Sequence, residues 1–265
     1  MRILFVGTLI IFFQFTCISR NIANYCISDV QFKSENILTY LLGGKFNHKI
    51  GAQKWKAPNL VNYTNSKRFA YTVCDTLIDF QVDTSSYRLV ILKTLMIDPE
   101  INIFADCNAC PPMIGLALFV KQKETWELTS FKIDVTCLGH FSAIPRASVM
   151  SIGNSRWAVR FKDDEVHEIG IERWFELNEA FKPLVDFIYS YRIIDENTSS
   201  GNEENDLYLV KELTIQTSDK DYFDLVFKNT TLMSDNTGDF ELKPVKYELQ
   251  KMVYEERLNM YQLVK

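Results

Sequence analysis

Proline, glycine and histidine are scarce in this sequence, with Pro 7, Gly 10 and His 3 in 265 residues. So little proline and glycine excludes a collagen-like chain and a long flexible linker. Basic residues are not in excess, because 29 Lys and Arg face 34 Asp and Glu, a net charge of −5. This balance gives no basic footprint for nucleic acid, and we expect none as a partner. Hydrophobic residues at 47% and charged residues at 24% indicate an ordered globular protein.

The motifs of several common enzyme classes are also missing. The sequence has no G-x-S-x-G nucleophile elbow, no H-E-x-x-H zinc motif, no Walker A loop and no G-x-G-x-x-G fingerprint. Its acidic residues are scattered through predicted turns, as at residues 163–165, where solvation explains them. We therefore predict no catalytic residue and no cofactor. An active site that only the fold assembles stays an open alternative.

The first residues have the pattern of a secretory signal peptide. Arg2 precedes an apolar run over residues 3–15, which at about 13 residues is shorter than the ~20 that span a membrane. Cys17 and Ser19 are small residues at the −3 and −1 positions of a cleavage site, so residues 1–19 are predicted to be removed. A buried N-terminal element and a lipid on Cys17 are the alternatives. No later run approaches 18 apolar residues, so we expect a periplasmic or secreted protein without a transmembrane segment.

One cysteine motif stands out in the predicted mature chain, Cys107-Asn108-Ala109-Cys110-Pro111-Pro112. Asn108 favours a turn, and Pro111 ends it by fixing its own φ and removing an amide donor. A turn would bring the two Cα atoms within the ~4.4–6.8 Å reach of a disulfide. We therefore predict a Cys107–Cys110 bridge that pins a loop between two strands.

The other cysteines leave several interpretations open. Five cysteines follow residue 19, and an odd number in an oxidising compartment leaves one thiol unpaired. We predict Cys26–Cys74 as a second bridge, with Cys137 free and buried. A zinc site at the C-x-x-C motif would need a second ligand pair, which only Cys137 and His140 offer, and these two are also weak candidates for catalysis. A redox motif would need a helix N-terminus after the cysteines, where the sequence is of β type.

Hydrophobic periodicity predicts a mainly β fold, an antiparallel sandwich or barrel-like sheets, with one short N-terminal helix. The helix is expected over Ser34–Leu42, with Ser34 as N-cap and Gly43-Gly44 as the stop. Residues 20–265 are predicted to form one β-rich domain, with 20–66 as a candidate N-terminal extension. Short runs separated by turn residues predict strands. They lie at residues 68–73, 77–82, 87–97, 113–121, 126–135, 147–152, 156–162, 167–177, 184–194, 207–217, 222–228, 240–249, 251–255 and 260–264.

Two further features concern surface chemistry. Residues 195–206 hold acidic residues and no basic one, between two predicted strands. They half match the spacing of a calcium-binding loop, but Ser200 stands where that loop needs Gly, so a mobile hairpin loop is predicted and calcium binding stays open. Asn62, Asn197 and Asn229 lie in N-x-S/T sequons, which matter only in a host that glycosylates.

Part of the chain resembles a type of exported, uncharacterised bacterial β-rich protein. The shared features run from residue 107 to about 187 and are Cys107-Asn108-Ala109-Cys110-Pro111-Pro112, Trp126-Glu127-Leu128, Gly139-His140-Phe141-Ser142-Ala143-Ile144-Pro145 and Ile152-Gly153-Asn154-Ser155-Arg156-Trp157-Ala158. The hairpin over residues 254–263 is similar to the closing hairpin of these proteins. Asn108 replaces the His that they tend to carry, which argues against a metal role. Some of them lie near interbacterial toxin systems, so the resemblance implies an immunity protein.

These observations predict an exported, non-enzymatic binding protein whose partner is another protein, a secreted effector or an envelope enzyme. Without Arg2 the net charge would be −6, from 28 basic and 34 acidic residues, and an acidic surface speeds association with a basic partner. An envelope hydrolase is one alternative, and it would show a deep pocket with perturbed carboxylates. A glycan or small-ligand module is another, and it would show a groove lined by Trp126, Trp157 or Trp174.

Overall fold

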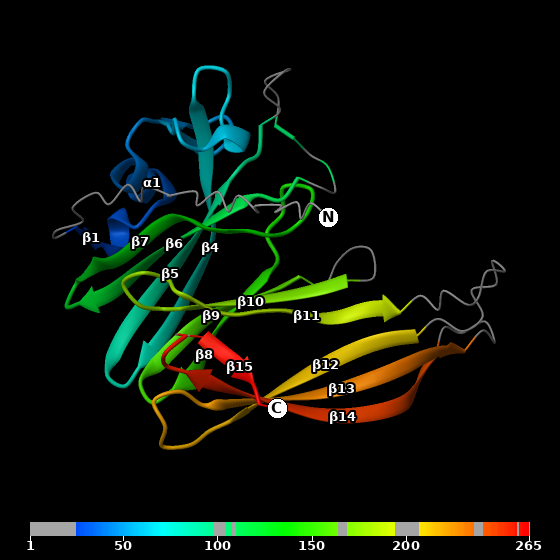
Figure 1. The fold of residues 1–265 in the computed structure, drawn as a ribbon. Helices are drawn as coiled ribbons and strands as arrows, with labels where there is room; N and C mark the ends of the chain where they lie inside the picture. Colours follow the sequence, from blue (N-terminus) through cyan, green and yellow to red (C-terminus); the bar gives the residue numbers. More distant parts are fainter. Residues whose placement is uncertain are drawn as a thin grey trace, which may run out of the picture.

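The computed structural model describes residues 25–97, 104, 105, 107, 110–163, 169–193, 207–235, 241–258 and 260–264. Over these residues the protein is mainly β with one short α-helix, as predicted. Its strands form two antiparallel sheets (Figure 1). The seven-stranded sheet has the order β1-β7-β6-β5-β4-β3-β2, and the eight-stranded sheet has the order β15-β14-β13-β12-β11-β10-β9-β8.

The elements follow one another along the chain mostly as hairpins, which explains why sequence neighbours are usually sheet neighbours. Their bounds are β1 Cys26–Ser28, η1 Asp29–Gln31, α1 Ser34–Leu42, β2 Lys45–Asn47, β3 Ala52–Lys56, η2 Val61–Tyr63, β4 Phe69–Val82, β5 Ser85–Thr94, β6 Met113–Gln122, β7 Thr125–Cys137, β8 Arg146–Gly153, β9 Arg156–Asp163, β10 Ile169–Glu176, β11 Pro183–Ile193, β12 Leu207–Gln216, β13 Asp224–Asp235, β14 Glu241–Glu255 and β15 Met260–Leu263.

The seven-stranded sheet is covered on both faces, which is why its central strands β5 and β6 are apolar at consecutive positions. Leu89 and Ile91 of β5 pack against Val159 and Phe161 of β9, so one face is buried by the eight-stranded sheet. The alternate residues, such as Val90, belong to a second cluster beneath α1. A strand with one exposed face has a polar residue at every second position, whereas a strand buried on both faces is apolar throughout.

Helix α1 forms over the predicted residues and ends at a glycine. Ile37, Leu38 and Leu41 are its buried stripe. Gly43 has φ +68, and its amide donates to the carbonyl oxygen of Thr39, which closes the last turn in a conformation that glycine adopts without strain. The predicted N-cap is wrong by one position, because Lys33 occupies it and makes no side-chain cap. Over the described residues, the candidate extension 20–66 supplies α1, β2 and β3 and the short edge strand β1.

Strand β4 corrects the prediction of two separate strands at 68–73 and 77–82. The structure has one continuous strand, Phe69–Val82, whose register against β5 shifts between Cys74 and Thr76. Asp75 is the extra, exposed residue at this β-bulge. After a bulge, the side chains that pointed to one face of the sheet point to the other, so the alternation of apolar and polar residues is interrupted. In the sequence this interruption looks like the end of a strand.

The eight-stranded sheet curls around a core of its own. Strand β15, at one end of the strand order, lies against β11 near the middle, so the sheet folds back on itself. Trp174, Leu225, Phe227 and Tyr261 fill the inside of this curl. The long strands β11–β14 extend away from the rest of the molecule (Figure 1).

Asp224, at the start of β13, should make folding stability depend on acid pH. Lys251 and Lys220 place their Nζ atoms 2.7 and 3.0 Å from its carboxylate. The hydrogen bond from Lys251, helped by Lys220, holds the pKa of Asp224 below its ordinary value. A lowered folded-state pKa stabilises the protein above the unfolded value of ~3.9 and loses this effect as pH falls through the folded value. We expect Asp224→Asn to cost about 1 kcal/mol at neutral pH, since the lysines are half exposed.

The measurement is urea unfolding of the wild type and Asp224→Asn between about pH 7 and pH 2. The difference in the free energy of unfolding should be constant above about pH 5, and it should shrink as the pH drops below ~3.9. A difference that stayed constant down to about pH 2 would contradict the assignment.

Candidate functional site

Three segments meet at one end of the molecule and form what we call the loop platform. They are η2, the described residues between β5 and β6, and the loop of residues 138–145 between β7 and β8. The Asn62 carbonyl accepts from the Ile97 amide, and the Cys107 carbonyl accepts from the Phe141 amide at 3.1 Å. Segments far apart in the sequence are thus held together by backbone hydrogen bonds.

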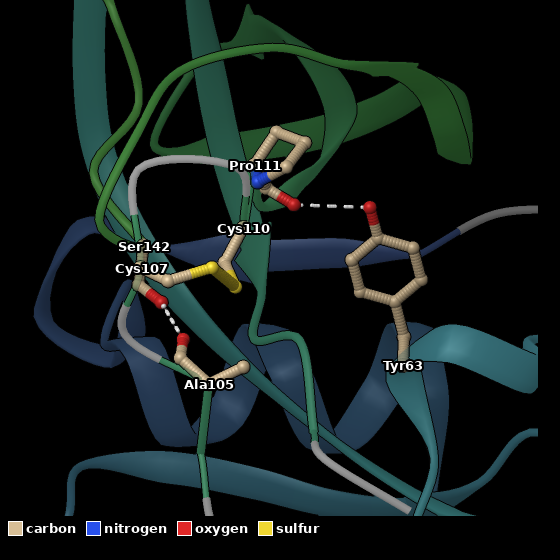
Figure 2. The surroundings of a disulfide bond; sticks show 6 residues. All are labelled: Tyr63, Ala105, Cys107, Cys110, Pro111 and Ser142. Atoms are coloured by element: carbon tan, nitrogen blue, oxygen red, sulfur yellow. Dashed lines mark hydrogen bonds between the residues drawn. A yellow bond between two sulfur atoms is a disulfide. The ribbon is translucent and has the colours of Figure 1, made fainter.

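The predicted Cys107–Cys110 disulfide is confirmed, and it lies at the centre of the loop platform (Figure 2). The Cα atoms of the two cysteines are 5.0 Å apart, and the Cys110 amide donates to the Cys107 carbonyl at 3.0 Å, which closes the expected turn. Both sulfur atoms are used by the bridge. Among the described residues no group of three His, Cys, Asp or Glu side chains is placed to hold a metal ion.

Tyr63 ties η2 to the disulfide segment. Its hydroxyl donates to the Pro111 carbonyl oxygen at 3.0 Å, as Figure 2 shows, and lies 3.1 Å from Sγ of Cys137. Burial, together with the hydrogen bond to Cys137, raises the pKa of Tyr63. Tyr63 therefore stays protonated and serves as a fixed hydrogen-bond donor between the loops.

The loop after β7 has an unusual backbone. Gly139 has φ +108, and Phe141 and Ser142, two and three residues further on, have φ +47 and +56. Non-glycine residues in this region cost energy and persist only where surrounding contacts hold them, often at functional sites. Here the Ser142 hydroxyl donates to the Ala105 carbonyl at 2.8 Å (Figure 2), and the Ser142 amide lies 3.4 Å from the Cys110 carbonyl oxygen.

This backbone presents apolar side chains to solvent. Phe141 is 55% exposed, and Val61 of η2 and Phe104 are 62% and 38% exposed. Each is attached to a segment that the hydrogen bonds above hold in place. Large apolar side chains on a pinned framework are typical of a binding surface, because little conformational entropy is lost when a partner covers them.

The structure separates the predicted Cys137 and His140 pair. Cys137 contacts Tyr63, whereas Nε2 of His140 lies 3.1 Å from the Asp163 carboxylate. Asp163 corrects a further expectation, since its side chain is buried at the end of β9 and does not lie at a solvated hairpin tip. Asp164 and Glu165 lie outside the described residues.

The second predicted bridge, Cys26–Cys74, is wrong, and both cysteines are free thiols. Cys26 is on β1 and Cys74 on β4, which are separated by β7, β6 and β5. At ~4.8 Å per strand spacing that is about 19 Å along the sheet, beyond the reach of a disulfide. Burial raises the pKa of the Cys74 thiol to about 12, so this thiol is unreactive at neutral pH. Cys137 is free as predicted but exposed, which corrects the expectation that it is buried.

The three tryptophans proposed for a groove do not share one. Trp174 is fully buried in the curl of the eight-stranded sheet. Trp157 packs on Phe80, with ring centroids 5.7 Å apart, on the face between the sheets. Trp126 is only 5% exposed and borders a surface hollow on the opposite face of the seven-stranded sheet.

Several carboxylates in the described residues bind cations. Glu172 is held by Arg160 and Glu176 by Arg156, each within the eight-stranded sheet. The pKa values of Asp29 and Asp224 lie below the ordinary value, because Lys121 hydrogen-bonds to the first and Lys251 to the second. A general acid needs a raised pKa, so these two groups are unsuited to that role.

The remaining predictions concern modification and segments that the structure does not place. Asn62 is exposed, but the side chain of Asn229 is buried, so Asn229 is inaccessible to glycosylation in the folded protein. Residues 1–19, the acidic segment 195–206 with its sequon, and His167 lie outside the described residues.

Sequence reasoning missed the residues that build the loop platform. Tyr63 stood out only as part of a sequon, and Phe141 lies in a positive-φ turn that has no Gly or Asn at its own position to indicate it. Only Gly139, two residues before it, carries the usual signal of such a turn.

Helix α1 has 9 residues, and nowhere in the described part of the chain is there a helix with the length and hydropathy to cross a bilayer. Comparisons with protein-family models, with curated proteins and with solved structures give no match to the chain. The resemblance to exported bacterial β-rich proteins therefore stays a prediction.

Proposed function

We propose that this is an exported, non-enzymatic binding protein that engages another protein through the loop platform. The observation that carries the proposal is Phe141, whose side chain is 55% exposed on a left-handed backbone that the disulfide segment holds by hydrogen bonds. Strain of this kind costs about 1–3 kcal/mol per residue, and an exposed ring does not repay it within the free protein. A partner that buries the ring would repay it.

An immunity protein that inhibits a secreted toxic enzyme is the specific form of this proposal. It rests on the resemblance of the segment around Cys107 and Cys110, and it agrees with the acidic net charge of −5, which favours a basic partner. The exposed aromatic ring of Phe141 would fill a pocket of the partner, since aromatic anchors contribute most of the binding energy in many interfaces.

The test is co-purification from the native envelope with wild-type protein and with Phe141→Asn. Asn tolerates positive φ better than Phe, so this variant should fold with equal or greater stability. Removal of the ring should nevertheless weaken capture of the partner by at least about tenfold, the effect of a hot-spot residue.

The matched control is Leu249→Asn, which removes an apolar side chain of β14 that is 73% exposed and far in the fold from the loop platform. We expect this variant to capture the partner as well as the wild type. Equal capture by Phe141→Asn and the wild type would refute the assignment of the loop platform.

A further inference from the structure

A second candidate site lies at the far end of β5 from the loop platform. It is a surface hollow of about 380 Å³ beside the β4–β5 turn, a size within the ~300–1,000 Å³ range of small-ligand sites. The residues around it are Asp79, Phe80, Gln81, Ser86, Tyr87, Lys121 and Trp126. The loop platform is joined to the other end of β5, so this hollow is independent of the function proposed above.

Strand alternation determines which groups the hollow presents. Gln81 pairs with Ser86, and Lys121 pairs with Trp126, so these four side chains form a row across four strands on one face. Phe80 and Tyr87 belong to the cluster between the two sheets, on the other face. They therefore line the hollow with their backbone, and its chemistry comes from the polar side chains of the row, because Trp126 is only 5% exposed.

Asp79 and Arg88 form a second row of side chains beside the first, and their contacts hold the residues of the hollow in place. The Arg88 guanidinium binds the Asp79 carboxylate through two hydrogen bonds of 2.6 and 2.7 Å. It also stacks 4.3 Å above the ring of Trp126. Asp29 accepts hydrogen bonds from Lys121 and from the indole of Trp126. These contacts order the side chains before a ligand arrives, which lowers the entropic cost of binding.

The charges around the hollow balance. Arg88 and Lys121 are the cations, and Asp29 and Asp79 are the anions that bind them. A balanced set of this kind has little net attraction for a phosphate or sulfate group. A neutral ligand is favoured, and it must meet donors and acceptors that alternate over a short distance.

We propose that this hollow binds a saccharide, a neutral ring with several hydroxyl groups. The Gln81 carboxamide and the Ser86 hydroxyl can each donate and accept, as vicinal sugar hydroxyls also can. Lys121 adds donors and Asp79 adds acceptors at the two sides. Trp126 is only 5% exposed, with Arg88 and Lys121 over its ring, so the sugar is held by hydrogen bonds from the polar row and not by stacking on the indole.

The experiment follows the indole N–H signals of protein labelled with ¹⁵N-tryptophan, of which the chain has four. The probes are the methyl glycosides of glucose, galactose, mannose and N-acetylglucosamine, their tetrasaccharides, and inorganic phosphate. At least one sugar should shift the Trp126 signal saturably, because the indole N–H shares Asp29 with Lys121, and the Kd should be roughly millimolar. The signal of Trp174, in the core of the eight-stranded sheet, should stay in place. Tighter binding of the tetrasaccharide identifies the end of a polysaccharide as the source, and equal binding identifies a free sugar.

Variants test the polar row directly. Gln81→Ala combined with Ser86→Ala removes two neutral hydrogen-bonding groups and should weaken sugar binding by about tenfold or more. Gln122→Ala is the matched control, because Gln122 is also exposed but follows Lys121 and points to the other face. No shift of Trp126 by any sugar, a shift by phosphate alone, or wild-type affinity in the double variant would overturn the proposal. Loss of the partner protein through Phe141→Asn would leave all these results unchanged.

Discussion

Arg160→Met is expected to lower the free energy of unfolding by about 3 kcal/mol. Nε of Arg160 lies 2.5 Å and Nη2 2.8 Å from the two carboxylate oxygens of Glu172, whose side chain is only 2% exposed. The indole of Trp174 donates to the same carboxylate at 2.6 Å. Without the guanidinium, the buried carboxylate of Glu172 loses its cation and keeps the hydrogen bond from Trp174. The arginine is itself 26% exposed, which places the effect at the low end of the range for buried pairs.

The double variant Arg160→Met and Glu172→Gln separates charge from packing. A Gln at position 172 keeps an oxygen that accepts from Trp174 but removes the charge, so it should recover most of the stability lost in Arg160→Met. Arg146→Met, at an exposed arginine of the neighbouring strand β8, should change stability by less than about 0.5 kcal/mol. Urea unfolding at neutral pH measures all three. Additive losses in the double variant would show that Arg160 acts through its aliphatic stem.

Gly139→Ala is expected to disrupt the loop platform, with a loss of about 2–4 kcal/mol in stability and of partner capture. Gly139 has φ +108, and a Cβ atom at this position would collide with the carbonyl oxygen of Ala143. Ala143 closes the turn by donating its amide to the His140 carbonyl at 2.8 Å. A displaced turn would move Phe141, and with it the aromatic ring that we assign to the partner.

Gly51→Ala is the control for backbone strain. Gly51 also has a positive φ, +63, but an added Cβ would meet nothing within 4 Å. Its cost should be about 1 kcal/mol, from the left-handed conformation alone, with partner capture retained. Thermal unfolding and co-purification measure both variants. Equal effects of the two substitutions would show that the contact with Ala143 does not control the loop.

Local patterns in the chain are enough for its class and for several of its elements. The stripe of Ile37, Leu38 and Leu41 with a following glycine predicts α1, because a helix needs only side chains three or four residues apart and a stop signal. Turn residues likewise predict the hairpin at Gly153. The closing hairpin is also predicted, but residues 251–255 are the end of β14, Glu241–Glu255, and the prediction of a separate strand there is wrong. The Cys107–Cys110 bridge was also local, since a single turn brings both sulfur atoms together.

Non-local features depended on the tertiary structure. The sequence by itself determined a β-rich chain with one early helix and one short disulfide loop, because periodicity, turn residues and close cysteines act within a few residues. Which strands lie between β1 and β4, and hence that Cys26 and Cys74 stay apart, is a property of the strand order. The strain at Phe141 and the row from Gln81 to Trp126 likewise come from hydrogen bonds and registers between distant segments. Such contacts form only when the whole sheet has closed, and no local pattern encodes them.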